Sequence, residues 1–191
     1  MELEKIAEAL RRRNFEAEVC ATRDAALARV KELAAGAKTL GTGGSATVNE
    51  IGAIDALKEM GLATFPHGAP EEQVADVYLL SANALLADGR IVNIDGTCNR
   101  VSASLYGPKK VVYVIGRNKV VEGGVDDAIV RIKAKACPPN ARRLGRRTPC
   151  AVGACTNCSS PDRMCKALVV FEGKPTHLPV HVLLVDEDLG F

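Results

Sequence analysis

Four cysteines towards the C-terminal end have the spacing of a metal-binding segment. They follow the pattern Cys150-x4-Cys155-x2-Cys158-x6-Cys165, and Gly, Ser, Pro and Asn separate them. The first two intervals are similar to those of ferredoxin-type iron–sulfur ligands, but four thiolates also form structural zinc sites. We expect these cysteines to bind an iron–sulfur cluster, most simply of the 4Fe–4S type. Zinc is the alternative, and a segment that binds no metal is the third.

The remaining three of the seven cysteines stand apart from this segment. An odd number of cysteines with four crowded together indicates metal or redox chemistry in a cytosolic chain, not a disulfide framework. We interpret Cys20 as a core thiol and leave Cys137, which precedes two prolines, outside the ligand set. Cys98 falls in a candidate pocket, where it is either a functional thiol or a small buried residue.

A glycine-rich stretch at residues 39–50 has the composition of an anion-binding loop. Its glycines let the backbone approach a ligand closely, and Ser45 is placed to cap a following helix. The free N–H groups at the start of such a helix attract a phosphate or a carboxylate. The spacing matches neither the P-loop nor the dinucleotide motif, and a plain turn is the alternative. The residues we expect to bind the anion are Gly41, Thr42, Gly43, Gly44, Ser45 and Thr47.

Further polar side chains follow strand-like runs. Asn83 comes after an apolar run, and Asp95, Asn99 and Arg100 come at or after the end of the next one. Ligands of open α/β sheets gather outside the carboxyl ends of the strands. We therefore expect a ligand here, although a turn at Asp95, a cap at Asn99 and a surface charge at Arg100 are the alternative. Lys119 follows a third, β-branched run in the same way.

The apolar pattern predicts alternating strands and helices, and hence an α/β fold with a single, largely parallel sheet flanked by helices. Expected helices cover residues 2–13, 22–33, 46–60 and 125–135, and expected strands cover residues 15–19, 38–40, 62–65, 91–96, 109–115, 167–171 and 180–185. The β-branched run at 109–115 is the best candidate for a central strand. We expect one domain over residues 1–191, with a cysteine-rich, metal-binding insertion at 137–166.

Composition narrows the class of protein. The 191 residues are 47% hydrophobic and 25% charged, with a net charge of +2, as in an ordinary soluble domain. The chain has no apolar run of membrane-spanning length and no signal-peptide core, so we expect a cytoplasmic protein without a membrane partner. Residues 129–160 are basic and contain no acid. They also contain no aromatic residue to stack on bases, so we expect a solvated face or a patch that offsets thiolate charge, not a nucleic-acid site.

Taken together, several motifs resemble those of the lactate-utilisation (LUD) domain family. They are GTGGSATVNEIG at 41–52, SANA at 81–84, VNIDGTCNRV at 92–101, GPKKV at 107–111 and GRNK at 116–119. The resemblance implies a fold like that of ribose-phosphate isomerases, glucosamine-phosphate deaminases and CoA transferases, in which a similar loop holds a phosphate or an acyl carrier. It also implies a link to iron–sulfur proteins in the oxidation of lactate to pyruvate. The cysteine segment lies outside the minimal domain and suggests a cysteine-rich branch.

Three functions fit these observations. The first, which we favour, is a redox protein of lactate or related hydroxy-acid utilisation that passes electrons through the cysteine centre to iron–sulfur partners. Arg100 or Lys119 then holds a small anionic ligand, a carboxylate or a phosphate. The second is a non-redox enzyme on a phosphorylated or acyl substrate, with Glu50 or Asp95 as general base and a structural zinc site. The third is a subunit that binds a small carboxylate without catalysis.

Overall fold

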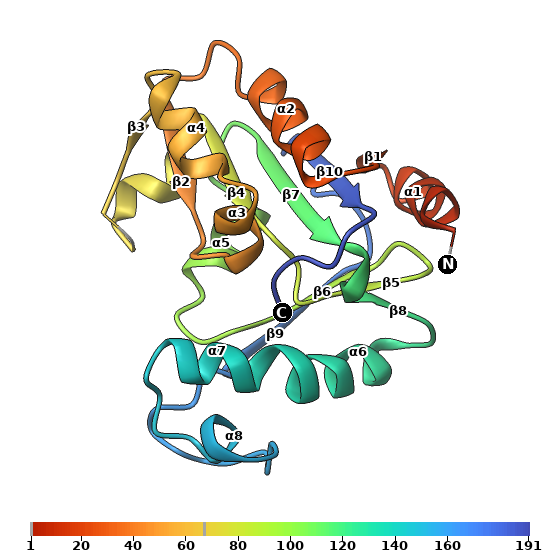
Figure 1. The fold of residues 1–191 in the computed structure, drawn as a ribbon, viewed down its shortest axis with the longest axis vertical. Coiled ribbons are helices and arrows are strands. Elements are labelled where there is room, and N and C mark those ends of the chain that lie inside the picture. The colour runs from red at the N-terminus through yellow and green to blue at the C-terminus, as the bar shows by residue number, and fades with distance from the viewer. Residues whose placement is uncertain (1, 67) are drawn as a thin grey trace.

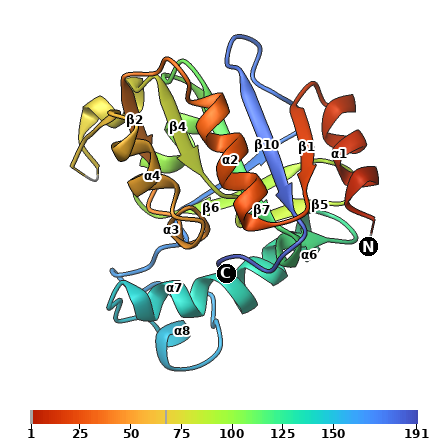
Figure 2. The ribbon, with the colours of Figure 1, turned by 45° about the horizontal axis from the view of Figure 1, so that its top comes forward.

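The computed structural model describes residues 2–66 and 68–191, which form two β-sheets packed between layers of helices (Figures 1 and 2). The larger sheet has six strands, all parallel, in the order β1-β10-β7-β4-β2-β3. Their bounds are β1 Glu16–Cys20, β2 Thr39–Thr42, β3 Ala63–Thr64, β4 Val77–Leu80, β7 Val111–Gly116 and β10 Val180–Val185. The predicted α/β class with a largely parallel central sheet is therefore confirmed.

Strand β7 lies inside this sheet, between β10 and β4, and all of its residues are buried. A run such as Val111–Ile115 suits a strand covered on both faces, because β-branched side chains pack well on a pleated surface. The prediction of a central strand at 109–115 is confirmed in its position. The strands predicted near both chain ends also form, as β1, β9 and β10.

A second sheet corrects the prediction of a single sheet. Its four strands run in the order β8-β5-β6-β9, and β6 is antiparallel to both neighbours. Their bounds are β5 Ala84–Leu86, β6 Ile91–Asp95, β8 Val120–Val121 and β9 Ala167–Phe171. A tight turn at Asp88-Gly89 joins β5 to β6, with the Gly89 N–H donating to the Leu86 carbonyl over 2.8 Å. Three-residue strands carry too little alternation to show which sheet they join.

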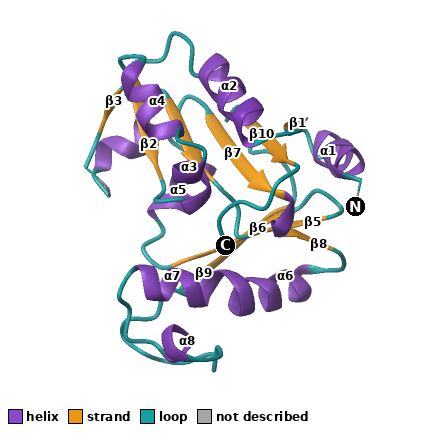
Figure 3. Ribbon diagram, in the orientation of Figure 1, coloured by secondary structure: helices purple, strands orange, loops and turns teal. Residues whose placement is uncertain are grey.

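Helices cover the outer faces of the two sheets (Figure 3). One face of the six-stranded sheet packs against α2, α3 and α4, and its other face packs against the second sheet, α1 and α5. The outer face of the second sheet packs against α6, the π-helical turn η3 and α7. The bounds are α1 Leu3–Arg12, α2 Arg23–Leu33, α3 Ala46–Glu50, α4 Ala53–Glu59, α5 Asn99–Leu105, α6 Val125–Arg131, η3 Ile132–Ala136 and α7 Cys137–Arg143.

Alternation along strand β4 shows how one sequence serves two cores. Val77 and Leu79 face the helices α2–α4, whereas Tyr78 and Leu80 face the second sheet. Between the sheets, Tyr113 and Phe171 form an edge-to-face pair with ring centroids 6.4 Å apart. The middle of the molecule is therefore a sheet-on-sheet core.

Two predicted helices differ from the structure in their course. The helix expected over 46–60 is broken at Gly52, whose φ of 67° is left-handed and separates α3 from α4. The helix expected over 125–135 continues as η3 and α7 instead of ending. Pro138 and Pro139 lack an N–H for the preceding turn, and their place at the start of α7 is where helices tolerate proline.

The cysteine segment leaves this layered body after α7. Its short helix α8, Pro149–Val152, is followed by residues 153–166 without a strand or further helix, and the chain then enters β9 (Figure 1). Two short 3₁₀ turns complete the described elements, η1 Pro70–Val74 and η2 Arg117–Lys119. Among the described helices, none is long and apolar enough to cross a membrane.

Candidate functional site

A cavity of about 440 Å³ opens where the carboxyl ends of β2, β4 and β7 face α7 and residues 161–166. This is the edge at which ligands of parallel sheets bind. The loop after each strand adds to one wall: Gly43–Ala46 after β2, Ser81–Asn83 after β4, and Lys119 after β7. The end of β6 and the turn after it add Asp95, Gly96 and Thr97, and the start of α5 adds Asn99 and Arg100. The structure thus brings most of the predicted binding residues together.

Lys119 lies at the inner end of this cavity with only 3% of its surface exposed. Its Nζ donates to Thr47 Oγ1 over 2.7 Å and to Ser81 Oγ over 2.8 Å. Burial, together with the positive charges of Arg131 and Arg100, lowers the pKa of Lys119 to about 7. In the part of the chain that the structure describes, no carboxylate forms an ion pair with this amine. The amine is therefore poised between its charged and neutral forms near neutral pH.

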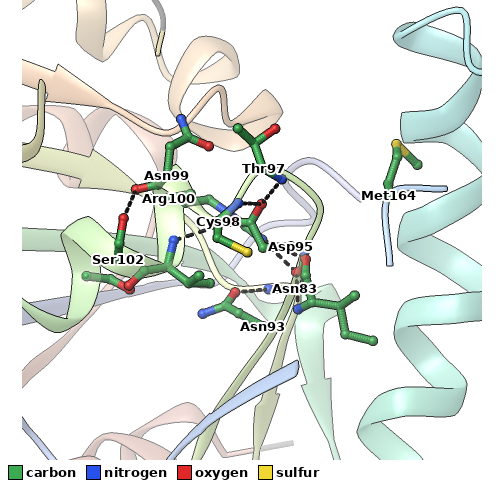
Figure 4. Close-up of polar contacts among 12 residues, drawn as sticks. Asn83, Asn93, Asp95, Thr97, Cys98, Asn99, Arg100, Ser102 and Met164 are labelled. Atoms are coloured by element: carbon green, nitrogen blue, oxygen red, sulfur yellow. Dashed lines mark hydrogen bonds and ion pairs between the residues drawn. The ribbon is translucent and has the colours of Figure 1, made fainter. Parts of the chain in front are cut away.

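Arg100 is anchored beside it by acceptors from two segments, the loop after β4 and the end of β6 (Figure 4). Its guanidinium donates to Asn83 Oδ1 over 2.9 Å and to the Ile94 carbonyl over 3.0 Å, and pairs with Asp95 at 3.4 Å. The side chain is 14% exposed. Gly43 makes room for it, since a Cβ at that position would lie 2.5 Å from Arg100 Cγ. The glycine loop therefore serves the placement of a cation as well as the approach of a ligand.

Asp95 holds the start of α5 in place. One carboxylate oxygen accepts from the N–H groups of Thr97 and Cys98 over 3.2 and 3.1 Å, and the other accepts from Val101 N over 3.2 Å (Figure 4). These bonds satisfy orphan donors of the helix N-terminus. Cys98 itself, with φ of 67°, is not among the residues that line the cavity. The predicted general base thus has a visible role in positioning Arg100 and α5, and its catalytic role stays a prediction.

Two buried donors near Asn83 have no acceptor among the described residues, Asn99 Nδ2 and Arg131 Nε. Arg131 also donates to the Asn83 carbonyl over 2.7 Å and to the Asn118 carbonyl over 2.8 Å, and burial lowers its pKa. No site role was predicted for Arg131. Its only signal was membership of the acid-free basic stretch, and that stretch does not show which of its residues turn inward.

The glycine loop divides into a cavity-facing part and a supporting part. Gly43, Gly44 and Ser45 line the cavity, and Ser45 Oγ accepts from Val48 N over 3.3 Å, so its predicted capping role is confirmed. Gly41 and Thr42 lie behind them. A Cβ on Gly41 would lie 2.6 Å from the Tyr78 ring, and Thr42 N donates to Glu72 Oε1 over 3.3 Å.

Thr47 and Glu50 lie outside the cavity lining as well. Thr47 is buried and acts through Lys119, whereas Glu50 is exposed and accepts from the Gly190 N–H over 2.7 Å. Glu50 therefore lies outside the cavity lining, although its negative charge still acts on Lys119 and opposes the lowering of that pKa. With five residues, α3 also has a smaller dipole than the predicted helix of fifteen, which weakens the expectation of a helix-start anion site.

The cavity as a whole is basic. Its lining has two acids, Asp95 and Asp162, and six basic residues, which are Arg100, Lys119, Arg143, Arg146, Arg163 and Lys166. Asp162 is engaged by Arg147 at 3.1 Å, which lowers the pKa of its carboxyl. Arg143 and Arg146 are exposed, as expected for a solvated basic face, and both also line the cavity. The site therefore carries excess positive charge, the arrangement that attracts an anion.

The four predicted metal ligands surround a second, much smaller cavity of about 20 Å³. Cys150, Cys155, Cys158 and Cys165 all line it, together with Lys133 and Arg163. In the described residues, no three His, Cys, Asp or Glu side chains already stand in the arrangement of a metal site. The donor type fits a thiophilic metal, and the two cations are placed to offset thiolate charge. The metal itself stays a prediction.

Cys137 lies closer to this group than its place in the sequence suggests. Its Sγ is 3.4 Å from Cys165 Sγ. This contact, with the charges of Arg163 and Lys133, lowers the pKa of Cys165, whereas the contact and burial raise the pKa of Cys137. Cys137 also lines the large cavity, and Arg163 and Met164 line both cavities. The ligand cavity and the cysteine segment therefore adjoin.

The fold and the site define an α/β protein with a cationic cavity at the edge of its parallel sheet. The LUD domain model matches residues 3–185, and the chain belongs to the LUD domain family. It is similar in structure to a DUF162 family protein from Deinococcus radiodurans, with 12% identity, a TM-score of 0.59 and coverage of 96% of this chain and 95% of that chain. At this identity the likeness shows the fold alone. No curated protein matches the sequence.

Proposed function

We propose that the protein binds a small carboxylate of the 2-hydroxy or 2-oxo acid class at the inner end of its large cavity, in lactate or related hydroxy-acid utilisation. The observation that carries this proposal is the excess of buried positive charge around Lys119. Membership of the LUD domain family supports the metabolic setting. The size of the cavity, about 440 Å³, leaves room for a larger acyl or phosphorylated ligand, which is the alternative.

The donors at the inner end suit a carboxylate. A protonated lysine has three N–H groups, and Thr47 and Ser81 occupy two of them, so one is left for a ligand. Arg100 adds a fixed charge beside it, held by Asn83 and Asp95. Hydrogen bonds between ionised groups contribute about 1.5–3 kcal/mol each, so two such contacts suffice for measurable binding of a small acid.

Calorimetric titration tests this proposal. L-lactate, pyruvate and inorganic phosphate are titrated into the wild-type protein and into Lys119→Met at pH 6.5. We expect a carboxylate to bind the wild-type protein and to bind the variant about ten-fold more weakly or worse. Arg117→Met is the matched control, because it removes one positive charge from an exposed side chain paired with Asp186 and Asp188.

The outcomes separate the alternatives. Equal affinity in the wild-type protein and Lys119→Met, or equal losses in Lys119→Met and Arg117→Met, would contradict a role for the inner cations. Binding of phosphate without either carboxylate would favour the phosphorylated or acyl substrate. Absence of binding by all three probes would reject the small-anion site.

We further propose that the cysteine segment holds a thiolate metal centre with a redox role, an iron–sulfur cluster, with zinc as the alternative. Convergence of Cys150, Cys155, Cys158 and Cys165 on one small cavity supports this proposal. Such a centre supplies one-electron chemistry when bound, and the surroundings of its sulfurs tune its potential. The chain's own contribution is Lys133 and Arg163, whose charges favour thiolates, and the wall shared with the ligand cavity.

Metal and sulfide analysis with a visible spectrum tests this second proposal, on protein purified without oxygen. Visible absorption with iron and acid-labile sulfide would support electron transfer. A colourless protein with one zinc per chain would make the centre a structural one. Protein that takes up neither metal on reconstitution would reject the centre.

A further inference from the structure

We infer that Cys137 is a ligand of the metal centre and shares one tetrahedral ion with Cys165. The inference rests on the proposed centre and changes its ligand set, which the spacing of the sequence gives as Cys150, Cys155, Cys158 and Cys165. The ligands that the structure assigns are Cys137, Cys150, Cys155 and Cys165, with Cys158 outside the set. The ion is a thiophilic one, zinc or iron.

The separation of the two sulfurs carries the inference. Cys137 Sγ and Cys165 Sγ are 3.4 Å apart. In a tetrahedral site with metal–sulfur bonds of about 2.3 Å, two ligand sulfurs are about 3.8 Å apart. The observed pair is within half an ångström of that edge, whereas the two residues are separated by 28 positions in the chain. Packing of α7 against the cysteine segment therefore pre-forms one edge of a metal site.

Cys150 and Cys155 are the thiols that pack with this pair. Cys137 and Cys150 are buried in the same apolar cluster, and Cys155 and Cys165 pack against it from its edge. Cys158 is not part of that cluster, although it lines the small cavity that Cys137 does not line, and its backbone carbonyl accepts from Arg163 over 2.7 Å. Cys155 lies in the stretch without helix or strand that follows α8.

Cys137 lies on a helix, which holds its thiol in a defined position for the metal. It is the first residue of α7, and the two prolines that follow fix the backbone there. The other three thiols lie in the short helix α8 or in the irregular stretch around it. A metal ligand on a helix can orient the ligands that lie on irregular segments. Helix α7 also lines the large cavity. The assignment therefore places the metal at the wall of the ligand cavity.

Metal affinity of three cysteine variants tests the inference. Wild-type protein, Cys137→Ser, Cys158→Ser and the remote control Cys20→Ser are loaded with zinc, and separately with iron and sulfide, and retention is measured against a chelator. We expect Cys137→Ser to bind zinc at least ten-fold more weakly, because one thiolate of four is lost. Cys158→Ser and Cys20→Ser should stay within two-fold of the wild type. Circular dichroism shows whether each variant is folded.

The outcomes distinguish the two ligand sets. Loss of metal in Cys158→Ser with retention in Cys137→Ser would overturn the inference and restore the ligand set given by the spacing. Loss in both would support Cys137 but show that Cys158 binds too. If Cys137→Ser fails to fold, retention of metal by Cys158→Ser still tests the ligand set, because loss there would restore Cys158 as a ligand. A wild-type protein that binds no metal would reject the proposed centre itself.

Discussion

Lys119 combines features that single residues seldom share: an ionisable side chain, near-complete burial and no ion pair with a carboxylate among the described residues. Its lowered pKa, about 7, makes the site sensitive to pH. We expect carboxylate affinity to rise as the pH falls through 7, because the amine gains its proton there. In Lys119→Met the affinity should be nearly independent of pH between 6 and 8. Titrations at several pH values check this, and equal slopes for the two proteins would contradict it.

The same amine affects stability, with a sign that follows from its pKa. The amine titrates near 7 in the folded protein and near 10.5 in the unfolded chain. Between these values only the unfolded chain holds the proton, so the contribution of Lys119 to folding stability rises with pH through this window and its full cost is present below 7. We expect Lys119→Met to gain stability relative to wild type at pH 6.5, and roughly 3 kcal/mol of that gain to vanish by pH 9.5. Urea unfolding at both pH values measures it, and a gain that is independent of pH would contradict the assigned pKa.

Gly43 lets the glycine-rich loop pack closely against Arg100. We expect Gly43→Ala to weaken ligand binding about ten-fold, since the added Cβ would meet Arg100 Cγ at 2.5 Å and displace a charged contact. Gly124→Ala is the control, because a Cβ there would come no closer than 4.0 Å to a neighbouring side chain. Calorimetry on both variants checks the prediction. Unchanged affinity in Gly43→Ala would show that the position of Arg100 does not matter for the ligand.

At the scale of elements, the cysteine segment is separable from the layered body. It packs on α7 and on the outer side of the second sheet, and it contributes nothing to the cores around the six-stranded sheet. We expect Cys155→Ser to abolish or weaken metal binding and to leave the main unfolding transition within a few degrees of the wild type. Calorimetric melting with metal analysis checks this. Loss of the whole fold would instead make the centre essential to the domain.

Sequence reasoning succeeded where an element carries its own signal. The buried β-branched run predicted β7, and the hydroxyl of Ser45 predicted a helix start. It failed where the signal is non-local. The antiparallel pairing of β6 and the contact between Cys137 and Cys165 depend on segments far apart in the chain. Similarly, Arg143 is an exposed charge, and only the fold shows that it also lines the cavity.

At the scale of the whole molecule, the interface between the two sheets is the core that joins the halves of the fold. Phe171 on β9 reaches Tyr113 on β7 across that interface. We expect Phe171→Ala to lower the free energy of unfolding by about 3–5 kcal/mol, the cost of a cavity at a buried aromatic. Leu168→Ala on the same strand is the control, since Leu168 is 48% exposed and should cost far less. Denaturant titration measures both, and similar losses would contradict the two-sheet core.

The layered arrangement also explains why the cavity lies where it does. The loops of the parallel sheet supply one wall, and α7 with the cysteine segment supplies the other. Residues as far apart in the chain as Ser45, Lys119 and Arg163 meet only because both sheets and the last helix layer stack in this order. The parallel sheet thus provides one wall of the cavity, and α7 with the cysteine segment provides the other.

A crystal structure with pyruvate or lactate bound at pH 6.5 tests the proposed carboxylate site most directly. We expect the carboxylate between Lys119 and Arg100, within hydrogen-bonding distance of Lys119 Nζ and next to Ser81. A ligand bound with its anionic group at Arg143 and Arg146, away from Lys119 and Arg100, would contradict the proposed site. The same structure would show whether the ligand reaches the wall that Cys137 and Met164 form.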